Sequence, residues 1–272
     1  MLELGWIAAL CALFAWWFST GAILAVVRLA DRHGPRACAA ATLLALPLLG
    51  VGVWGYVTTL PMQGHMAVYG AFLSALAIWG WIELAFLTGQ VTGPMARPCP
   101  PGVTEGERFI RAWGTIAYHE MLLAGMLLAM ALYGWGAENL FGLWTFAVLF
   151  FARISAKLNL FYGVPKINVE FIPQALAHLP SHFRTGRINR LFPLSVSALT
   201  AATACWLERI IATDSTASLV GFSLLAAITA LALLEHWLMV IPWQDAKLWR
   251  WMLPERHNQN NKTYGPEDVH GL

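Results

Sequence analysis

The sequence predicts an all-α protein, a polytopic membrane bundle of seven transmembrane helices. Hydrophobic residues make up 58% of the 272 residues and charged residues only 12%, about half the share in a soluble domain. The mean hydropathy is +0.59, and apolar runs of about 20 residues, enough for one bilayer crossing, recur along the chain. We expect residues 1–252 to form one transmembrane domain and residues 253–272 to form a polar, mobile cytoplasmic tail.

The apolar runs follow one another with mostly short connections, so they are expected to pack as a single bundle. The first run is too long for a cleaved signal peptide, and its basic residues, Arg28 and Arg32, follow it instead of preceding it. The sequence contains no convincing internal repeat. In chain order, the predicted spans are 4–27, 38–60, 66–87, 111–133, 140–162, 191–211 and 217–241.

Basic residues alternate between the two ends of this bundle. They follow the first, third and fifth spans and the last one, whereas Arg209 is the only basic candidate in the remaining loops. Because Lys and Arg accumulate in cytoplasmic loops, the N-terminus is predicted to lie outside and the C-terminus in the cytoplasm. The loop residues that carry this prediction are Arg28, Arg32, Arg36, Arg97, Arg108, Lys166, Arg184, Arg187 and Arg190.

The net charge of +2 does not identify a partner. The basic cytoplasmic face favours anionic lipid head groups, and no folded basic domain supports nucleic-acid binding. The cysteines, Cys11, Cys38, Cys99 and Cys205, are too far apart in sequence to indicate a CxxC metal site or a disulfide framework.

Polar residues inside the spans form the most informative pattern. Ionisable groups are costly in a bilayer and usually face the bundle interior or a water-filled cavity. The spans that contain them run in alternating directions, yet at ~1.5 Å per residue most of these groups fall roughly 7–13 Å from the cytoplasmic boundary. We therefore expect four spans to bring their polar groups to one layer. The candidates are Glu83, His119, Glu120, Arg153, Lys157, Asn159, Glu235 and His236.

Charge pairing is expected within this layer. Arg153 and Lys157 are four residues apart, so they share one helix face and repel each other unless anions oppose them. The available anions are Glu83, Glu120 and Glu235.

Three interpretations fit the layer. A buried ion-pair network would fix the helix register without any ligand. Alternatively, Glu83, His119, Glu120, Glu235 and His236 supply ligand types that non-haem iron accepts, and a neutral His can ligate the magnesium of a chlorophyll. No Glu-x-x-His or His-x-x-x-His spacing occurs within a span. The third interpretation is a proton or substrate path, although the paired broken helices of many transporters are not indicated.

Two connections and several tryptophans add weaker signals. His178 and His182 are four residues apart, but Pro180 between them argues against a regular helix and favours interfacial histidines over metal ligands. The loop 88–109 is rich in Gly and Pro and is predicted to be irregular. Trp79, Trp81 and Trp113 lie near the polar layer, where helix packing or a pocket for a flat ligand could engage them.

Three stretches resemble one known family. They are "FLTGQVTGPMARPCPPGVTEGERFIRAWGTIAYHE", "FFARISAKLNLFYGVPKINVEFIPQALAHLPSHF" and "EHWLMVIPWQDAKLW". Together they are similar to the photosynthetic complex assembly proteins of purple phototrophic bacteria (PuhE type), and the resemblance extends through about residue 252. The segment "YGVPKIN" departs from the more usual "LGVPN"-like form, which weakens any role for Lys166.

This resemblance implies an inner-membrane factor that assists assembly of the photosynthetic reaction centre and light-harvesting complexes. It also implies that the partners are photosynthetic complex subunits or proteins of bacteriochlorophyll biosynthesis. Our hypothesis for the mechanism is that the polar layer forms a cavity on the cytoplasmic side that handles bacteriochlorophyll or a precursor. The location would be multi-pass in the bacterial inner or intracytoplasmic membrane, with a periplasmic N-terminus. The alternative is a membrane-embedded, metal-dependent enzyme acting on a tetrapyrrole or lipid.

Overall fold

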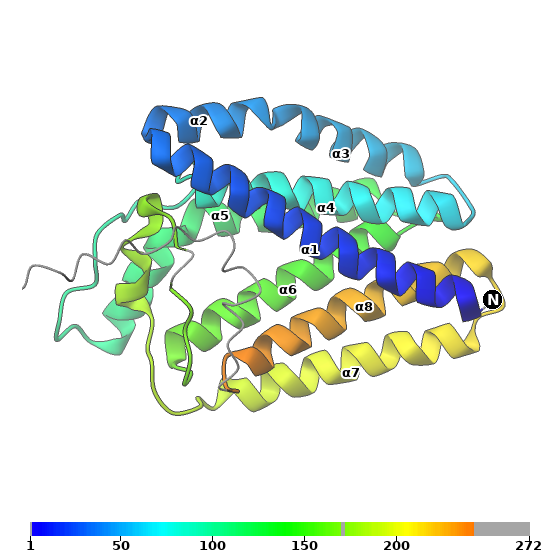
Figure 1. Cartoon of the computed structure of the whole chain (residues 1–272). Helices are drawn as coiled ribbons and strands as arrows, with labels where there is room; N and C mark the ends of the chain where they lie inside the picture. The colour runs from blue at the N-terminus through cyan, green and yellow to red at the C-terminus, as the bar shows by residue number, and fades with distance from the viewer. Residues whose placement is uncertain (1, 170–171, 242–272) are drawn as a thin grey trace, which may run out of the picture.

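The computed structural model of the chain is a bundle of long α-helices (Figure 1). It describes residues 2–169 and 172–241, so the predicted tail 253–272 lies outside the described residues. Within those ranges the β-structure is limited to an isolated bridge between Val164 and Thr185.

Seven segments of the described chain are long and apolar enough to cross a membrane, which confirms the predicted fold class. The helices are α1 (Leu2–His33), α2 (Pro35–Leu44), α3 (Leu46–Thr59), α4 (His65–Leu87), α5 (Glu105–Tyr133), α6 (Phe141–Tyr162), α7 (Leu191–Ala212) and α8 (Thr216–Leu238). Two short 3₁₀ turns, η1 (Gln174–Leu176) and η2 (Leu179–His182), lie between α6 and α7.

The second span differs from the prediction because it is interrupted. α2 ends at Leu44 and α3 begins at Leu46, with Pro47 in its first turn. Proline has no backbone N–H, and its ring clashes with the carbonyl of the residue four positions earlier. A continuous helix over 38–60 is therefore broken where Pro47 meets the preceding turn.

Three helices end or begin away from the approximate bounds of the predicted spans, among them α1, which continues beyond 27 to His33. α5 begins at Glu105 instead of 111, because the Thr104 side chain caps it by accepting a hydrogen bond from the Glu107 amide at 3.3 Å. Thr104 and Glu107 have the spacing of a capping box. α8 ends at Leu238, before the predicted 241.

The centre of the bundle is formed by α4 and α8, the most buried spans, while α1 and α7 lie on its outside (Figure 1). Ala8 and Ala12 of α1 are completely buried against a core that contains Phe72 of α4 and Leu224 of α8. Small side chains allow helices to approach closely in a membrane, so α1 packs directly on the central pair.

The connections 88–104 and 163–190 meet at one end of the bundle, which we call the loop end. The amide of Cys99 donates to Ser181 Oγ at 2.9 Å. Arg108 donates to the carbonyls of Phe161 and His182, both at 2.9 Å. The predicted irregular loop is thus held in place by specific contacts, and Pro180 lies within the 3₁₀ turn η2, not in an α-helix.

Candidate functional site

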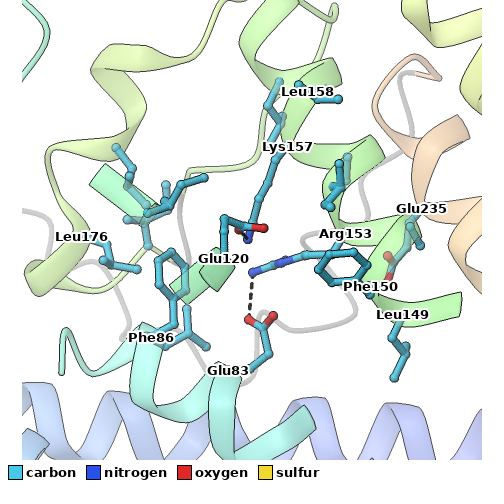
Figure 2. Close-up of a pocket in the computed structure, with 18 of the residues that line it drawn as sticks. Glu83, Phe86, Glu120, Leu149, Phe150, Arg153, Lys157, Leu158, Leu176 and Glu235 are labelled. Atoms are coloured by element: carbon cyan, nitrogen blue, oxygen red, sulfur yellow. Dashed lines mark hydrogen bonds and ion pairs between the residues drawn. The ribbon is translucent and has the colours of Figure 1, made fainter. Parts of the chain in front are cut away.

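A cavity of about 730 Å³ lies toward the loop end, between α1, α4, α5, α6, α8 and the connection 163–190. This volume is in the range of small-molecule sites, ~300–1,000 Å³. Its walls are mostly apolar, but charged side chains cross it at one level. These side chains, which we call the charged belt, are Glu83, Glu120, Arg153, Lys157 and Glu235 (Figure 2).

Two ion pairs within the belt have the predicted arrangement. Arg153 donates from Nη2 to Glu83 Oε2 at 2.9 Å, and Lys157 forms an ion pair with Glu120. Both cations project from α6, and their partners come from α4 and α5. Glu83 and Glu120 are buried, so each pair links α6 to a neighbouring helix across the interior of the bundle.

His119 lies behind the belt. Its side chain is completely buried, and its ring centroid is 4.3 Å from that of Phe86. Its Nε2 is 3.7 Å from Glu83 Oε1, which is too long for a direct hydrogen bond. Neither ring nitrogen has a hydrogen-bond partner within the described structure. His119 therefore contacts the belt without lining the cavity.

Glu235 is the unmatched member of the belt. Its carboxylate projects into the cavity from α8, near Arg153 (Figure 2). None of the hydrogen bonds or ion pairs found among the described residues includes it, whereas Glu83 and Glu120 each engage a cation. The belt thus presents one acidic group that its two bases do not pair.

The other two predicted residues point elsewhere. His236 contacts Ser155 Oγ through Nε2 at 2.9 Å and the Ala232 carbonyl through Nδ1 at 2.7 Å, which fixes α8 against α6. Asn159 donates to Ser195 Oγ at 2.9 Å and accepts a hydrogen bond from Asn189 at 3.0 Å. Neither side chain lines the cavity.

The predicted metal ligands do not gather into one group. Among residues 2–169 and 172–241, no three His, Cys, Asp or Glu side chains are arranged to hold a metal ion. Two of the belt acids instead face cations, and His236 is occupied at both ring nitrogens by Ser155 and Ala232.

A segment of the 88–104 connection supports the site from the outside of α5. The Thr92 carbonyl accepts a hydrogen bond from the His119 amide at 3.0 Å, and the Met95 amide donates to the Gly114 carbonyl at 3.0 Å. A Cβ atom on Gly93 would lie 2.2 Å from the Gly114 oxygen. Gly93 therefore allows the connection to lie against the backbone of α5, and Gly114 leaves room for the Met95 side chain. No pattern in the sequence predicts this contact.

The two histidines of the loop end, His178 and His182, are buried, and one of them reaches the cavity. Burial lowers the pKa of both His178 and His182, so both favour the neutral imidazole. His182 forms part of the cavity wall, as do Trp79 and Trp113, whereas Trp81 donates to the Thr42 carbonyl at 3.2 Å outside the cavity. His182 was predicted to be interfacial, and only the fold of the connection brings it to the site.

These features define a polytopic membrane protein whose mostly apolar cavity is crossed by charged side chains, of which Glu83 and Glu120 are buried. The chain belongs to the family described as "Protein of unknown function (DUF3623)", whose model matches residues 1–260. It is 52% identical over 252 residues to a Rhodobacter capsulatus protein described as "Uncharacterized 30.4 kDa protein in puhA 5'region", covering 92% of this chain and 91% of the relative. No solved structure matches the chain.

Proposed function

We propose that the protein assists assembly of photosynthetic complexes in a bacterial inner or intracytoplasmic membrane, and that its cavity holds bacteriochlorophyll or a precursor. The assembly role is supported by the resemblance of the sequence to the PuhE-type family. It is also supported by the Rhodobacter capsulatus relative, which is 52% identical and is described as lying in the 5′ region of puhA. The gene name puhA and the family name PuhE share the prefix puh. The partners would be photosynthetic complex subunits or proteins of bacteriochlorophyll biosynthesis.

The observation that carries the pigment role is the Glu235 carboxylate, which no described residue pairs, in a cavity whose walls are mostly apolar. A magnesium tetrapyrrole is flat and largely apolar, with a metal at its centre and carbonyl groups at its edge. Apolar walls suit its faces, and a carboxylate oxygen is a ligand type that magnesium accepts. Arg153 and Lys157 are hydrogen-bond donors for peripheral carbonyl groups.

Purification from phototrophically grown cells tests this proposal directly. The wild-type protein in mild detergent should retain a tetrapyrrole pigment, measured by absorbance after extraction, with no stoichiometric transition metal by elemental analysis. Glu235→Gln keeps the size of the side chain and should lower the retained pigment at normal protein abundance. Glu208→Gln, on α7 and outside the cavity lining, is the matched control and should retain the wild-type amount.

Two results of that experiment would contradict the proposal. Wild-type protein without pigment would remove the basis for a pigment site. A stoichiometric transition metal without pigment would instead favour the metal-dependent enzyme acting on a tetrapyrrole or lipid.

The assembly role and the membrane orientation have separate tests. Deleting the gene should lower the amount of assembled photosynthetic complexes or pigment and leave respiratory growth largely intact; unchanged complexes and pigment would count against the role.

Reporter fusions in the segments 28–37, 88–110 and 163–190 should give cytoplasmic signals. A periplasmic signal from 163–190 would overturn the orientation with the N-terminus in the periplasm.

A further inference from the structure

The charged belt divides the cavity into two parts along the helix axes. Toward the loop end, the outer compartment is lined mainly by aromatic and aliphatic side chains that include Phe86, Phe109, Phe161, Leu176 and Leu179, and also by Lys166, Asn168 and His182 of the connection. On the opposite side of the belt, the deep compartment is lined by Leu76, Trp79 and Gly80 of α4, Ala124 of α5, Leu149 of α6, and Ile228 and Ala232 of α8.

The deep compartment has the chemistry of a site for an aliphatic chain, and it is long enough to take the first part of one. Leu76 precedes Glu83 by seven residues, and Ile228 precedes Glu235 by the same number. At ~1.5 Å per residue, the compartment extends about 10 Å beyond the belt. Part of its wall is α1, where Ser19 donates to the Trp16 carbonyl of its own helix at 3.1 Å. Ordered water needs several polar partners, which suits this space less than hydrocarbon.

The outer compartment differs in the kind of surface that it offers. Its phenylalanines come from α4, α5, α6 and the connection 163–190, and aromatic rings pack well against other flat rings. The belt lies between the two parts, where a ligand's polar atoms could meet the charges. The order of surfaces is therefore aromatic, then charged, then aliphatic.

We propose that the cavity binds an amphiphile in one orientation, with its ring in the outer compartment, its polar atoms at the belt and its aliphatic chain in the deep compartment. The identification of the ring as a tetrapyrrole rests on the proposed function; the placement of the chain does not. The ligand class is therefore a tetrapyrrole esterified with a long-chain alcohol, in preference to the chain-free acid.

Filling the deep compartment separates the chain from the ring. Ala124→Phe and Ala232→Leu add side-chain volume at two lining positions on different helices. The neighbouring Gly125 is exposed, does not line the cavity and has no atom within 4 Å of an added Cβ. Gly125→Phe is therefore the matched control, with a similar apolar addition on the same helix but outside the cavity.

The experiment uses the full-length protein in lipid nanodiscs and two probes, bacteriochlorophyll a and its chain-free acid, bacteriochlorophyllide a. We expect both filling variants to weaken binding of the esterified pigment by about tenfold or more, because several buried methylene contacts are lost. Binding of the chain-free acid should stay within about twofold of wild type, since the ring site is untouched. Gly125→Phe should leave both affinities unchanged. Equal effects on both probes, or none on the esterified pigment, would overturn the placement of the chain.

A phospholipid labelled in its acyl chain distinguishes the pigment's chain from that of a membrane lipid. If the esterified pigment displaces the label from wild type, the placement is supported; a bound label that the pigment does not displace assigns the compartment to lipid and overturns the esterified-pigment class. If neither pigment binds, the proposed function fails. In that case, if the wild-type protein retains the labelled lipid and Ala124→Phe does not, the deep compartment still binds an aliphatic chain. If the wild-type protein does not retain the labelled lipid, the chain compartment is ruled out.

Discussion

Two groups of opposite charges lie in the same half of the molecule, in different surroundings. The charged belt pairs Glu120 with Lys157 inside the bundle, and the Glu120 side chain is only 6% exposed. At the loop end, Glu105 pairs with Arg108 at 3.2 Å and also with Arg184, but the Glu105 side chain is 64% exposed. In both groups a glutamate faces basic side chains, and the two glutamates differ most in their exposure.

Burial makes an imbalance of charge consequential. Pairs at a surface contribute little, because water solvates either partner when the other is removed. A charge inside the bundle has no such alternative, and removing its partner is strongly destabilising. The loop-end cluster can therefore carry an excess of arginine, and within the belt the pairing matters most for Glu83 and Glu120, which are buried. Glu235 is exposed to the cavity, so it can stay charged without a partner among the described residues.

The largest expected effect comes from breaking the more buried pair. Glu120→Leu leaves Lys157, whose side chain is 18% exposed, without its partner and should lower the free energy of unfolding by about 3–5 kcal/mol. Unfolding in mixed detergent micelles measures this change. The double variant Glu120→Leu/Lys157→Met should recover most of the loss, because it leaves no unpaired charge. A double variant as unstable as the single one would show that the pair is not the source.

The next effect concerns the backbone contact that supports the belt from α5. Gly93→Ala places a methyl group only 2.2 Å from the Gly114 carbonyl oxygen. This clash should lower the free energy of unfolding by about 1–3 kcal/mol. Gly106→Ala is the control in the first turn of α5, where an added Cβ meets no atom within 4 Å. It should be neutral or stabilising by up to about 1 kcal/mol. Equal behaviour of the two variants would contradict the close approach.

The sequence was sufficient for the number of long apolar helices and for the meeting of the two ion pairs of the belt. Length and hydropathy identify a span, and the alternating direction of the spans predicts that Glu83, Glu120, Arg153 and Lys157 lie together. Helix breaks and ends were less predictable, because each depends on a single local contact. Pro47 lies within a strongly apolar stretch that hides the break, and Thr104 lies in a polar stretch before the apolar residues that identify the span.

The limits for the site have a different physical cause. The position of a residue along a helix does not determine the direction in which its side chain points around the helix axis. His236 and Asn159 therefore contact Ser155 and Ser195 outside the cavity. The contact between Gly93 and Gly114 and the position of His182 depend on how a Pro-rich connection folds against α5. No periodic pattern reports such a contact. Binding of a cofactor by the predicted residues stays a prediction.

A smaller effect is expected from pH at the loop end. Burial and the nearby Arg108 and Arg111 lower the pKa of His182 from its ordinary value of 6.5, against a raising contribution from its contact with the Arg97 carbonyl. The unfolded chain then binds a proton at a higher pH than the folded protein does. Stability should be complete above pH 6.5 and fall as the pH decreases below it. The unfolding midpoint measured from pH 7.5 to 5.5 should show this decline, and His182→Gln should reduce it. An identical pH profile in the variant would assign the decline to other groups.

The smallest effect is expected at Glu105, the exposed glutamate of the loop end. It tests whether an exposed glutamate contributes less to stability than the buried Glu120. Glu105→Gln removes the charge that faces Arg108 and Arg184 at the loop end. Arg108 keeps its hydrogen bonds to the Phe161 and His182 carbonyls and its guanidinium lies 3.8 Å from the centroid of the Phe161 ring. It therefore remains well placed without Glu105, and the unfolding midpoint should not change measurably, at low or at high salt. Arg108→Met should be clearly more destabilising than Glu105→Gln, because it leaves both carbonyls without their donor. If Glu105→Gln instead destabilises the protein as much as Glu120→Leu, then burial is not what distinguishes the pair of Glu120 and Lys157 from the pair at the loop end.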